Sequence, residues 1–129
     1  MKAPLVAVAV LSSTGCFLAA AGAGAGGGIY FTQRGVESVV AAPVERASAA
    51  TEQTFRQLGI RQTKTAAEQE GGQDKREIEG ATTDREVAVT LTSAAQGSTR
   101  VQVVAKKSAV TWDKDFARSI LEKIVALSK

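Results

Sequence analysis

The chain has 129 residues, and its 16 Lys and Arg against 13 Asp and Glu give a formal net charge of +3 at pH 7. This length suits one domain with a hydrophobic core of its own. The sequence has no histidine and one cysteine, which excludes Ser-His-Asp and Cys-His catalytic sites, His-rich zinc sites and an internal disulfide. Because basic residues are interspersed with acidic ones, we expect no nucleic-acid binding.

The stretch from Lys2 to Cys16 combines one positive charge, a short apolar run and small residues that end in the only cysteine. The run from Ala3 to Leu11 has the length of a signal-peptide core and is too short to span a bilayer. Thr14-Gly15-Cys16 resembles the end of a bacterial lipoprotein signal, with Ser13 where such signals usually carry an aliphatic residue. The resemblance implies cleavage before Cys16 and attachment of lipid to its thiol, so Cys16 is the predicted lipid attachment residue.

Two other fates of the leader fit the same residues. The general signal peptidase can cut after small-x-small sites such as Ala19-Ala20-Ala21, which would release a secreted soluble binding domain. Alternatively, the uncharged run from Ala3 to Gln33 stays uncut and crosses the membrane as a single Gly-rich helix. Gly22 and Gly26 then have the spacing that lets membrane helices approach closely.

A low-complexity tether follows the leader. Residues Phe17 to Gly28 are almost entirely Ala and Gly, a composition that cannot bury enough surface to fold alone. Ile29, Tyr30 and Phe31 then form an aromatic cluster that either packs on the domain or lies at a lipid interface. The predicted organisation is a signal peptide at 1–15, a lipidated tether at 16–34 and one α+β domain at 35–129.

The domain is predicted to begin with a strand and a helix. Val36 to Ala42 is typical of a strand, and Pro43 ends it. Pro43 also suits the start of a helix, and Glu45 adds negative charge to the first turn. Apolar residues at three- and four-residue spacing continue this helix to Leu58, and Gly59 is its expected stop.

Four strand-like segments come next, with short connections that favour an antiparallel meander. The clearest alternate apolar and polar residues, as Val87, Val89 and Leu91 do. The segments are Ile60 to Gln69, Lys75 to Thr83, Glu86 to Thr92 and Arg100 to Lys106.

A second amphipathic helix is predicted at the end of the chain. Asp113 is a good cap for a helix from Lys114 to Leu127. Trp112, just before it, could be an exposed contact residue, but we predict a core anchor at this strand-to-helix junction. The order βαββββα predicts an α+β two-layer sandwich, with an antiparallel sheet of four to five strands and both helices on one face.

The whole pattern resembles a known family. The matching parts are the signal ending in Cys16, the Gly/Ala tether, the helix entry at 42–46 (Ala-Pro-Val-Glu-Arg), the helix end at 55–60 (Phe-Arg-Gln-Leu-Gly-Ile) and the segment 119–124 (Ser-Ile-Leu-Glu-Lys-Ile). These features resemble a family of small bacterial lipoproteins of unknown function. The resemblance implies a cell-envelope lipoprotein of βαββββα form and supplies no activity.

Two carboxylate pairs are the candidates for acid–base chemistry. Glu77 and Glu79 share one face of a strand, and Asp113 and Asp115 stand at a helix start. Two carboxylates can divide acid and base roles when burial separates their pKa values. Alternating Glu on an exposed strand is normally solvated, however, and Asp at a helix start normally caps it. We therefore predict no enzymatic activity and no catalytic, cofactor-binding or metal-binding residues.

The sheet face away from the helices is the predicted contact surface, and it can be plain solvent surface or a docking face for an envelope protein partner. An unpaired edge strand could add to it by accepting a partner strand.

The other predicted partner is membrane lipid, through acylated Cys16. Phe17 follows the cysteine in place of the Asp that often signals inner-membrane retention in Gram-negative lipoproteins, which favours the outer membrane in such an organism. On the sheet face away from the helices, the residues predicted to point outward are Glu77, Glu79, Thr90, Thr92, Arg100, Gln102 and Lys106.

Overall fold

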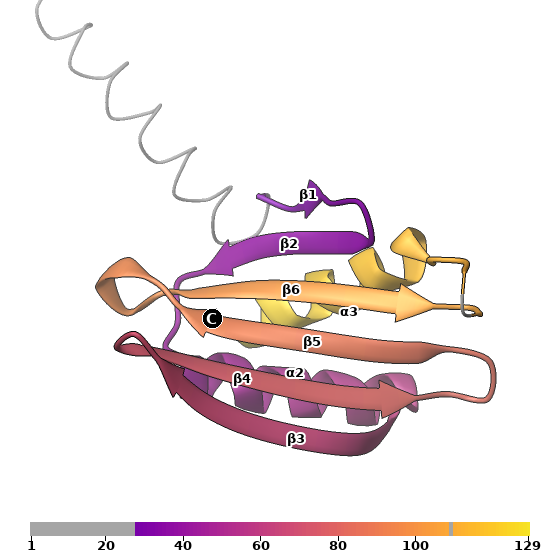
Figure 1. Ribbon diagram of the computed structural model, residues 1–129, viewed down its shortest axis with the longest axis horizontal. Coiled ribbons are helices and arrows are strands. Elements are labelled where there is room, and N and C mark those ends of the chain that lie inside the picture. Colours follow the sequence, from indigo (N-terminus) through magenta and orange to yellow (C-terminus); the bar gives the residue numbers. More distant parts are fainter. Residues whose placement is uncertain (1–27, 109) are drawn as a thin grey trace, which may run out of the picture.

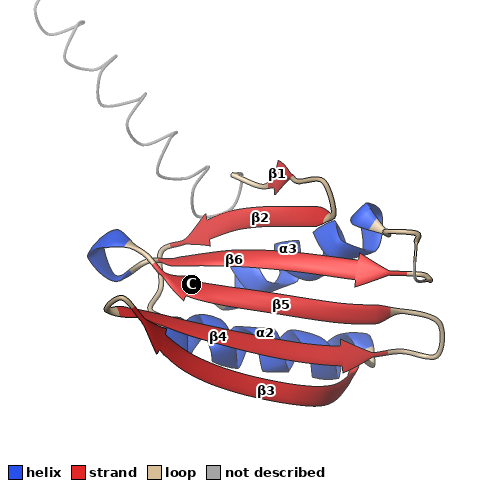
Figure 2. Ribbon diagram, in the orientation of Figure 1, coloured by secondary structure: helices blue, strands red, loops and turns tan. Residues whose placement is uncertain are grey.

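The computed structural model describes residues 28–108 and 110–129, which form two packed layers. One layer is a six-stranded antiparallel sheet, and the other consists of two helices that both lie on the same side of it (Figure 1). The other side of the sheet is left open (Figure 2). The predicted α+β class and the placement of both helices on one face are confirmed.

The elements follow one another with short connections. Strands β1 (Tyr30–Phe31) and β2 (Gly35–Val40) precede helix α2 (Val44–Leu58). Four strands follow, which are β3 (Arg61–Glu70), β4 (Gln73–Ala81), β5 (Glu86–Ser93) and β6 (Thr99–Lys106). A short 3-10 turn, η2 (Ala95–Gly97), joins β5 to β6, and helix α3 (Lys114–Leu127) is the last element of the fold.

The sheet order is β1-β2-β6-β5-β4-β3, so the predicted meander of the last four strands is present. Strand β2 pairs with β6, which is far from it in sequence, from Gly35 opposite Val104 to Val40 opposite Thr99. This pairing is possible because α2 carries the chain across the sheet from β2 to β3 at the opposite side (Figure 1).

The helix ends are fixed by local hydrogen bonds, as the sequence predicts. Helix α2 ends at Gly59, which has a φ of 72°, and the N–H of Ile60 donates to the carbonyl of Phe55 at 2.8 Å. This is the closure expected of a C-terminal glycine. Helix α3 begins where Asp113 Oδ1 accepts a hydrogen bond from the N–H of Phe116 at 3.0 Å.

The core lies between the helices and the inner face of the sheet. Alternate residues of β2, β4, β5 and β6 point into it, and the buried Thr99 hydroxyl donates to the carbonyl of Ala42 at 2.7 Å. Burial of this apolar surface is the main stabilising contribution to such a fold. The largest fully buried apolar side chains are Phe55, Ile78, Leu91, Ile120, Leu121 and Ile124.

The predicted count of four to five strands is wrong, because Tyr30 and Phe31 form a sixth strand, β1, paired with β2. A tight turn brings the chain back: the N–H of Thr32 donates to the Gly35 carbonyl at 2.8 Å, and the N–H of Gly35 donates to Thr32 Oγ1 at 3.0 Å. Two residues are too short a stretch to show the alternation that identifies a strand in sequence.

The connection between β3 and β4 is also tighter than the sequence suggests. The predicted break spans Glu70 to Asp74, whereas only Gly71 and Gly72 lie outside the strands. Both glycines have positive φ, 58° and 83°, as a two-residue hairpin turn requires. The strands therefore run on to Glu70 and start again at Gln73.

Candidate functional site

The open face of the sheet carries the polar residues that the sequence predicts there. Glu77 is opposite Thr90, and Thr90 is opposite Gln102, so the three side chains cross the sheet in one row. Thr92 lies opposite Arg100 in the next row. All seven predicted residues, which are Glu77, Glu79, Thr90, Thr92, Arg100, Gln102 and Lys106, lie on this face, and all but Arg100 are half-buried.

The open face carries charges of both signs. The carboxylates Glu77 and Glu79 lie on β4, and the cations Arg100 and Lys106 lie on β6. Arg100 Nε is 3.6 Å from a carboxylate oxygen of Glu37 on β2. An exposed pair of this kind contributes little to stability. The arrangement suits a polar partner surface that presents charges of both signs.

One end of the open face is hollowed into a groove of about 430 Å³. Carboxylates of Glu79 and Glu86 and the amine of Lys106 surround a floor that includes the small apolar residues Ala88 and Val104. Such a groove can receive a single side chain of a partner. Its other lining residues are Thr63, Gly80, Ala81 and Val87.

Trp112 lies at the end of this face and is not the core anchor that the sequence suggests. It forms a bridge with Lys106 at the end of β6, and Lys106 points to the open side. The Lys106 Nζ is 5.4 Å and the Arg34 Cζ 5.6 Å from the centre of the indole ring. Each cation over an aromatic ring stabilises the cluster by about 0.5–1 kcal/mol at an exposed site. The half-buried indole thus lies outside the core, with two cations near its ring.

Asp113 joins the start of α3 to the turn between β4 and β5. Its Oδ2 accepts a hydrogen bond from Arg85 Nε at 2.7 Å, while its Oδ1 accepts from the N–H of Phe116. The N–H of Phe116 and then the Arg85 guanidinium lower the pKa of Asp113 below its usual range. The hydrogen bond to Asp113 in turn raises the pKa of Arg85. Asp113 therefore has the structural role of a helix cap, and Asp115 stays exposed in the first turn.

The aromatic cluster at β1 lies at the edge of the sheet and remains open to solvent. Tyr30 is 67% and Phe31 55% exposed, on opposite faces of the strand. The guanidinium carbon of Arg118, on α3, is 5.9 Å from the centre of the Phe31 ring. Only Ile29 of the three packs against the core cluster.

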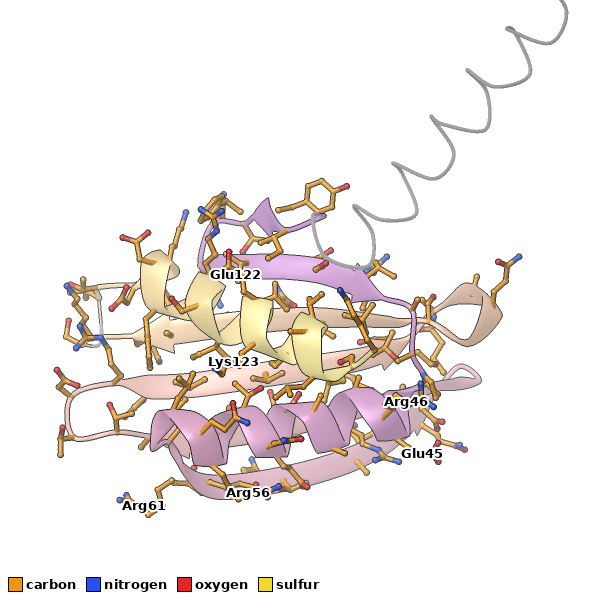
Figure 3. The ribbon with its side chains drawn as sticks, turned by 180° about the vertical axis from the view of Figure 1, so that it is seen from behind. Glu45, Arg46, Arg56, Arg61, Glu122 and Lys123 are labelled. Carbon is orange, nitrogen blue, oxygen red and sulfur yellow. The ribbon has the colours of Figure 1, made fainter. Side chains whose placement is uncertain are left out.

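The helix layer presents a different surface, of solvated mixed charge. Figure 3 shows Glu45, Arg46 and Arg56 of α2 pointing away from the sheet, together with Glu122 and Lys123 of α3. These labelled residues form no cluster of functional groups.

Comparison with known proteins gives a family and no activity. The family model described as "Protein of unknown function (DUF3568)" matches residues 1–126. The chain belongs to the DUF3568 family. A search of curated proteins finds no match.

The DUF3568 chain brings some of its candidate residues together and not others. Glu77 and Glu79 share the open face, whereas Asp113 lies at the helix start with Arg85. Cys16 lies outside the described residues. Within 28–108 and 110–129, no three His, Cys, Asp or Glu side chains gather as a metal site would require. None of the helices in these described ranges has the length and hydrophobicity of a membrane span.

Two features of the DUF3568 domain are not predicted from its sequence. Arg85 shows no local signal, because its partner Asp113 is remote in the chain. The cations around Trp112 come from the β1–β2 turn and from β6. The sequence shows only that these segments contain basic residues and does not show that they meet Trp112.

Two replacements of Asp113 should show how much its contacts with the N–H of Phe116 and with Arg85 contribute to stability. Asp113→Ala loses the cap, which lowers the free energy of unfolding by about 1 kcal/mol, and it also removes the acceptor of Arg85 Nε, so that Arg85 keeps only its ion pair with Asp84. Asp113→Asn keeps an oxygen for the N–H of Phe116 and loses the charge and the acceptor for Arg85 Nε, so the loss should be smaller than for Asp113→Ala. Urea denaturation at pH 7 measures both variants.

The same variants give a pH dependence of known sign. Because folding lowers the pKa of Asp113, its charged form stabilises the protein above the pKa of the unfolded chain, and this contribution disappears as the pH falls through the lowered value. The free energy of unfolding of the wild type should therefore fall more steeply in acid than that of Asp113→Asn. Identical acid profiles would show that the contact with Arg85 does not stabilise the fold.

Proposed function

We propose that this protein is a lipid-anchored component of a bacterial cell envelope whose α+β domain is a non-catalytic interaction or structural module. The observation that carries the proposal is the order of features along the chain. A short apolar run ends in Thr14-Gly15-Cys16, an Ala/Gly stretch follows, and a compact domain begins with β1. This is the order expected of an anchor, a tether and a working domain.

The physical chemistry of such an anchor supports stable attachment. Each buried methylene contributes about 0.8 kcal/mol, and two or three acyl chains on Cys16 would hold the protein where one chain would not. A flexible tether of about a dozen residues reaches roughly 20 Å. It would hold the domain just off the bilayer, in the outer membrane if the organism is Gram-negative.

The anchored end of the domain carries residues that suit a membrane surface. The tether enters the domain at β1, where Tyr30 and Phe31 are exposed. Arg118 lies over Phe31, and Arg34 lies over Trp112 close by. Aromatic and basic side chains are the ones that tolerate the boundary between lipid and water.

The open face supports the interaction role of the domain. It displays side chains of a sheet of six paired strands, and no described helix covers it (Figure 2). Its carboxylates, cations and hydroxyl groups would be matched by an envelope protein of complementary charge.

The test is the intact mass of the protein purified from membranes, with fragmentation of its N-terminal peptide. We expect a chain that starts at Cys16 and carries diacylglyceryl and acyl groups. Cys16→Ala should lose the modification and leave the membrane fraction, whereas the neighbouring control Ser12→Ala should stay there.

Two results would contradict the proposal. An unmodified chain that starts near Met1, with Cys16→Ala still in the membrane, would make the leader a membrane helix. An unmodified soluble chain cut after Ala21 would make the domain a secreted one.

A further inference from the structure

The two edges of the sheet differ in what they offer to another strand. Strand β1 has two residues, whereas β3 has ten and contains no proline. Strand β3 pairs with β4 alone, and Figure 1 shows it as the outermost strand, with no element drawn beyond it. Proteins usually keep such edges short or interrupted, because free N–H and C=O groups accept another strand.

The register of β3 shows which part of this edge is regular. The pairing with β4 is irregular between Gln62 and Lys64 and then continues without interruption to the hairpin turn. Lys64 and Glu68 are exposed in this regular part, and Ala66 lies midway between them. These three residues share the open face, because Ala66 is opposite Glu77.

The charges at this edge are complementary to themselves. Along an antiparallel pair of strands, opposed residues alternate between hydrogen-bonded and non-hydrogen-bonded pairs. When the two strands are identical and related by a twofold axis, the axis must therefore pass between one residue and its own copy in the partner. With Ala66 on the axis, Lys64 stands opposite the partner's Glu68, and Glu68 stands opposite the partner's Lys64. If the axis passed through either neighbouring residue instead, Lys64 and Glu68 would not both stand opposite a partner residue of opposite charge.

Strand β4, the neighbour of β3 within the sheet, extends the same alternation of charge. Glu79 lies opposite Lys64, and Lys75 lies opposite Glu68. Across the junction, the row would read Glu79, Lys64, the partner's Glu68 and the partner's Lys75, so that the charges alternate in sign. The residue at the axis is alanine, which leaves room for two backbones and two small side chains.

We propose that β3 binds the β3 strand of a second copy of this chain, antiparallel and centred on Ala66. The two sheets then form one continuous sheet, with both helix layers on one side and both open faces on the other. This pairing uses only β3, so it stands whether or not Cys16 carries lipid. A contact of a few residues is small, and we expect it to be reversible and concentration-dependent.

Cysteine cross-linking of the full chain tests the register. Ala66→Cys should give a disulfide-linked dimer on oxidation, because the introduced thiol of each chain faces the same thiol of its copy across the axis. Thr92→Cys is the matched control, since it lies on the same face in the middle of the sheet. The wild-type chain shows how much of the product comes from Cys16.

A mixed experiment fixes the alignment. Chains with Lys64→Cys, mixed with chains carrying Glu68→Cys, should link to each other more readily than either links to itself. Two Lys64 positions would lie roughly 13 Å apart in the proposed pair, at about 3.3 Å per residue. Equal linking at Ala66 and Thr92, or no preference in the mixture, would overturn the proposed pairing.

Charge exchange tests the chemistry of the contact. Lys64→Glu and Glu68→Lys should each raise the dissociation constant of the dimer roughly tenfold or more, because each places like charges together twice per dimer. The double variant Lys64→Glu/Glu68→Lys should recover most of the affinity. Sedimentation equilibrium of the full chain in non-ionic detergent measures these constants.

The control for this exchange is Glu122→Lys, which places a like charge beside Arg118 within helix α3 of one chain and leaves the β3 edge unchanged. Its dissociation constant should remain near that of the wild type. A monomeric wild type at all concentrations would overturn the proposal, as would a double variant no tighter than the single ones.

Discussion

Replacing Phe55 with alanine is expected to lower the free energy of unfolding by about 3–5 kcal/mol. The Phe55 ring is 1% exposed and lies between α2 and the sheet, where a β-carbon placed on Gly80 would be 2.7 Å from its Cε2 atom. Removing the ring leaves a cavity that the rigid strand β4 cannot fill. Small domains have a total stability of about 5–15 kcal/mol, so urea denaturation followed by circular dichroism should show a large shift.

A second variant shows whether the ring and Gly80 form one packing unit. Gly80→Ala alone should cost about 1–3 kcal/mol, because the new methyl group meets Phe55 and Ile60 at 2.7 Å. In the Phe55→Ala protein the contact with the ring is absent, whereas those with Ile60 and the Arg61 carbonyl oxygen remain. The cost of the methyl group should therefore fall by at least about 0.5 kcal/mol without disappearing. Strictly additive losses would mean that the two sites are independent.

Those parts of the fold that depend on neighbouring residues could be predicted from the sequence. Helix α3 has its predicted bounds because Asp113 caps it locally, and α2 stops at Gly59 as expected. The outward side chains of β4, β5 and β6 were predictable too, since alternation alone decides the face on which a residue lies.

Those parts that depend on remote residues could not be predicted in this way. Only the folded chain brings β2 beside β6 and Arg85 beside Asp113. Trp112 follows the same rule: its apolar ring suggests burial, but its bridge to Lys106 places it outside the core. The candidate contact face was thus predictable, whereas the groups at its end were not.

Gly35 is another residue whose importance depends on a remote partner, and Gly35→Ala is expected to lower the free energy of unfolding by about 3 kcal/mol or more. Gly35 starts β2 opposite Val104, and a β-carbon there would overlap the carbonyl oxygen of Val103. A backbone carbonyl within a strand cannot rotate away as a side chain can. The start of β2 must therefore separate from β6.

The effect of Gly35→Ala should also be visible in the folded protein. Arg34, the preceding residue, lies over Trp112, the one tryptophan of the chain, so displacement of β2 should change the native tryptophan fluorescence. Gly59→Ala is the control, because its β-carbon meets no atom within 4 Å and only the φ of 72° is unfavourable, at about 1–2 kcal/mol. It should leave the fluorescence unchanged. If Gly35→Ala were no more destabilising than Gly59→Ala, the close approach of β2 to β6 would not limit the residue at this position.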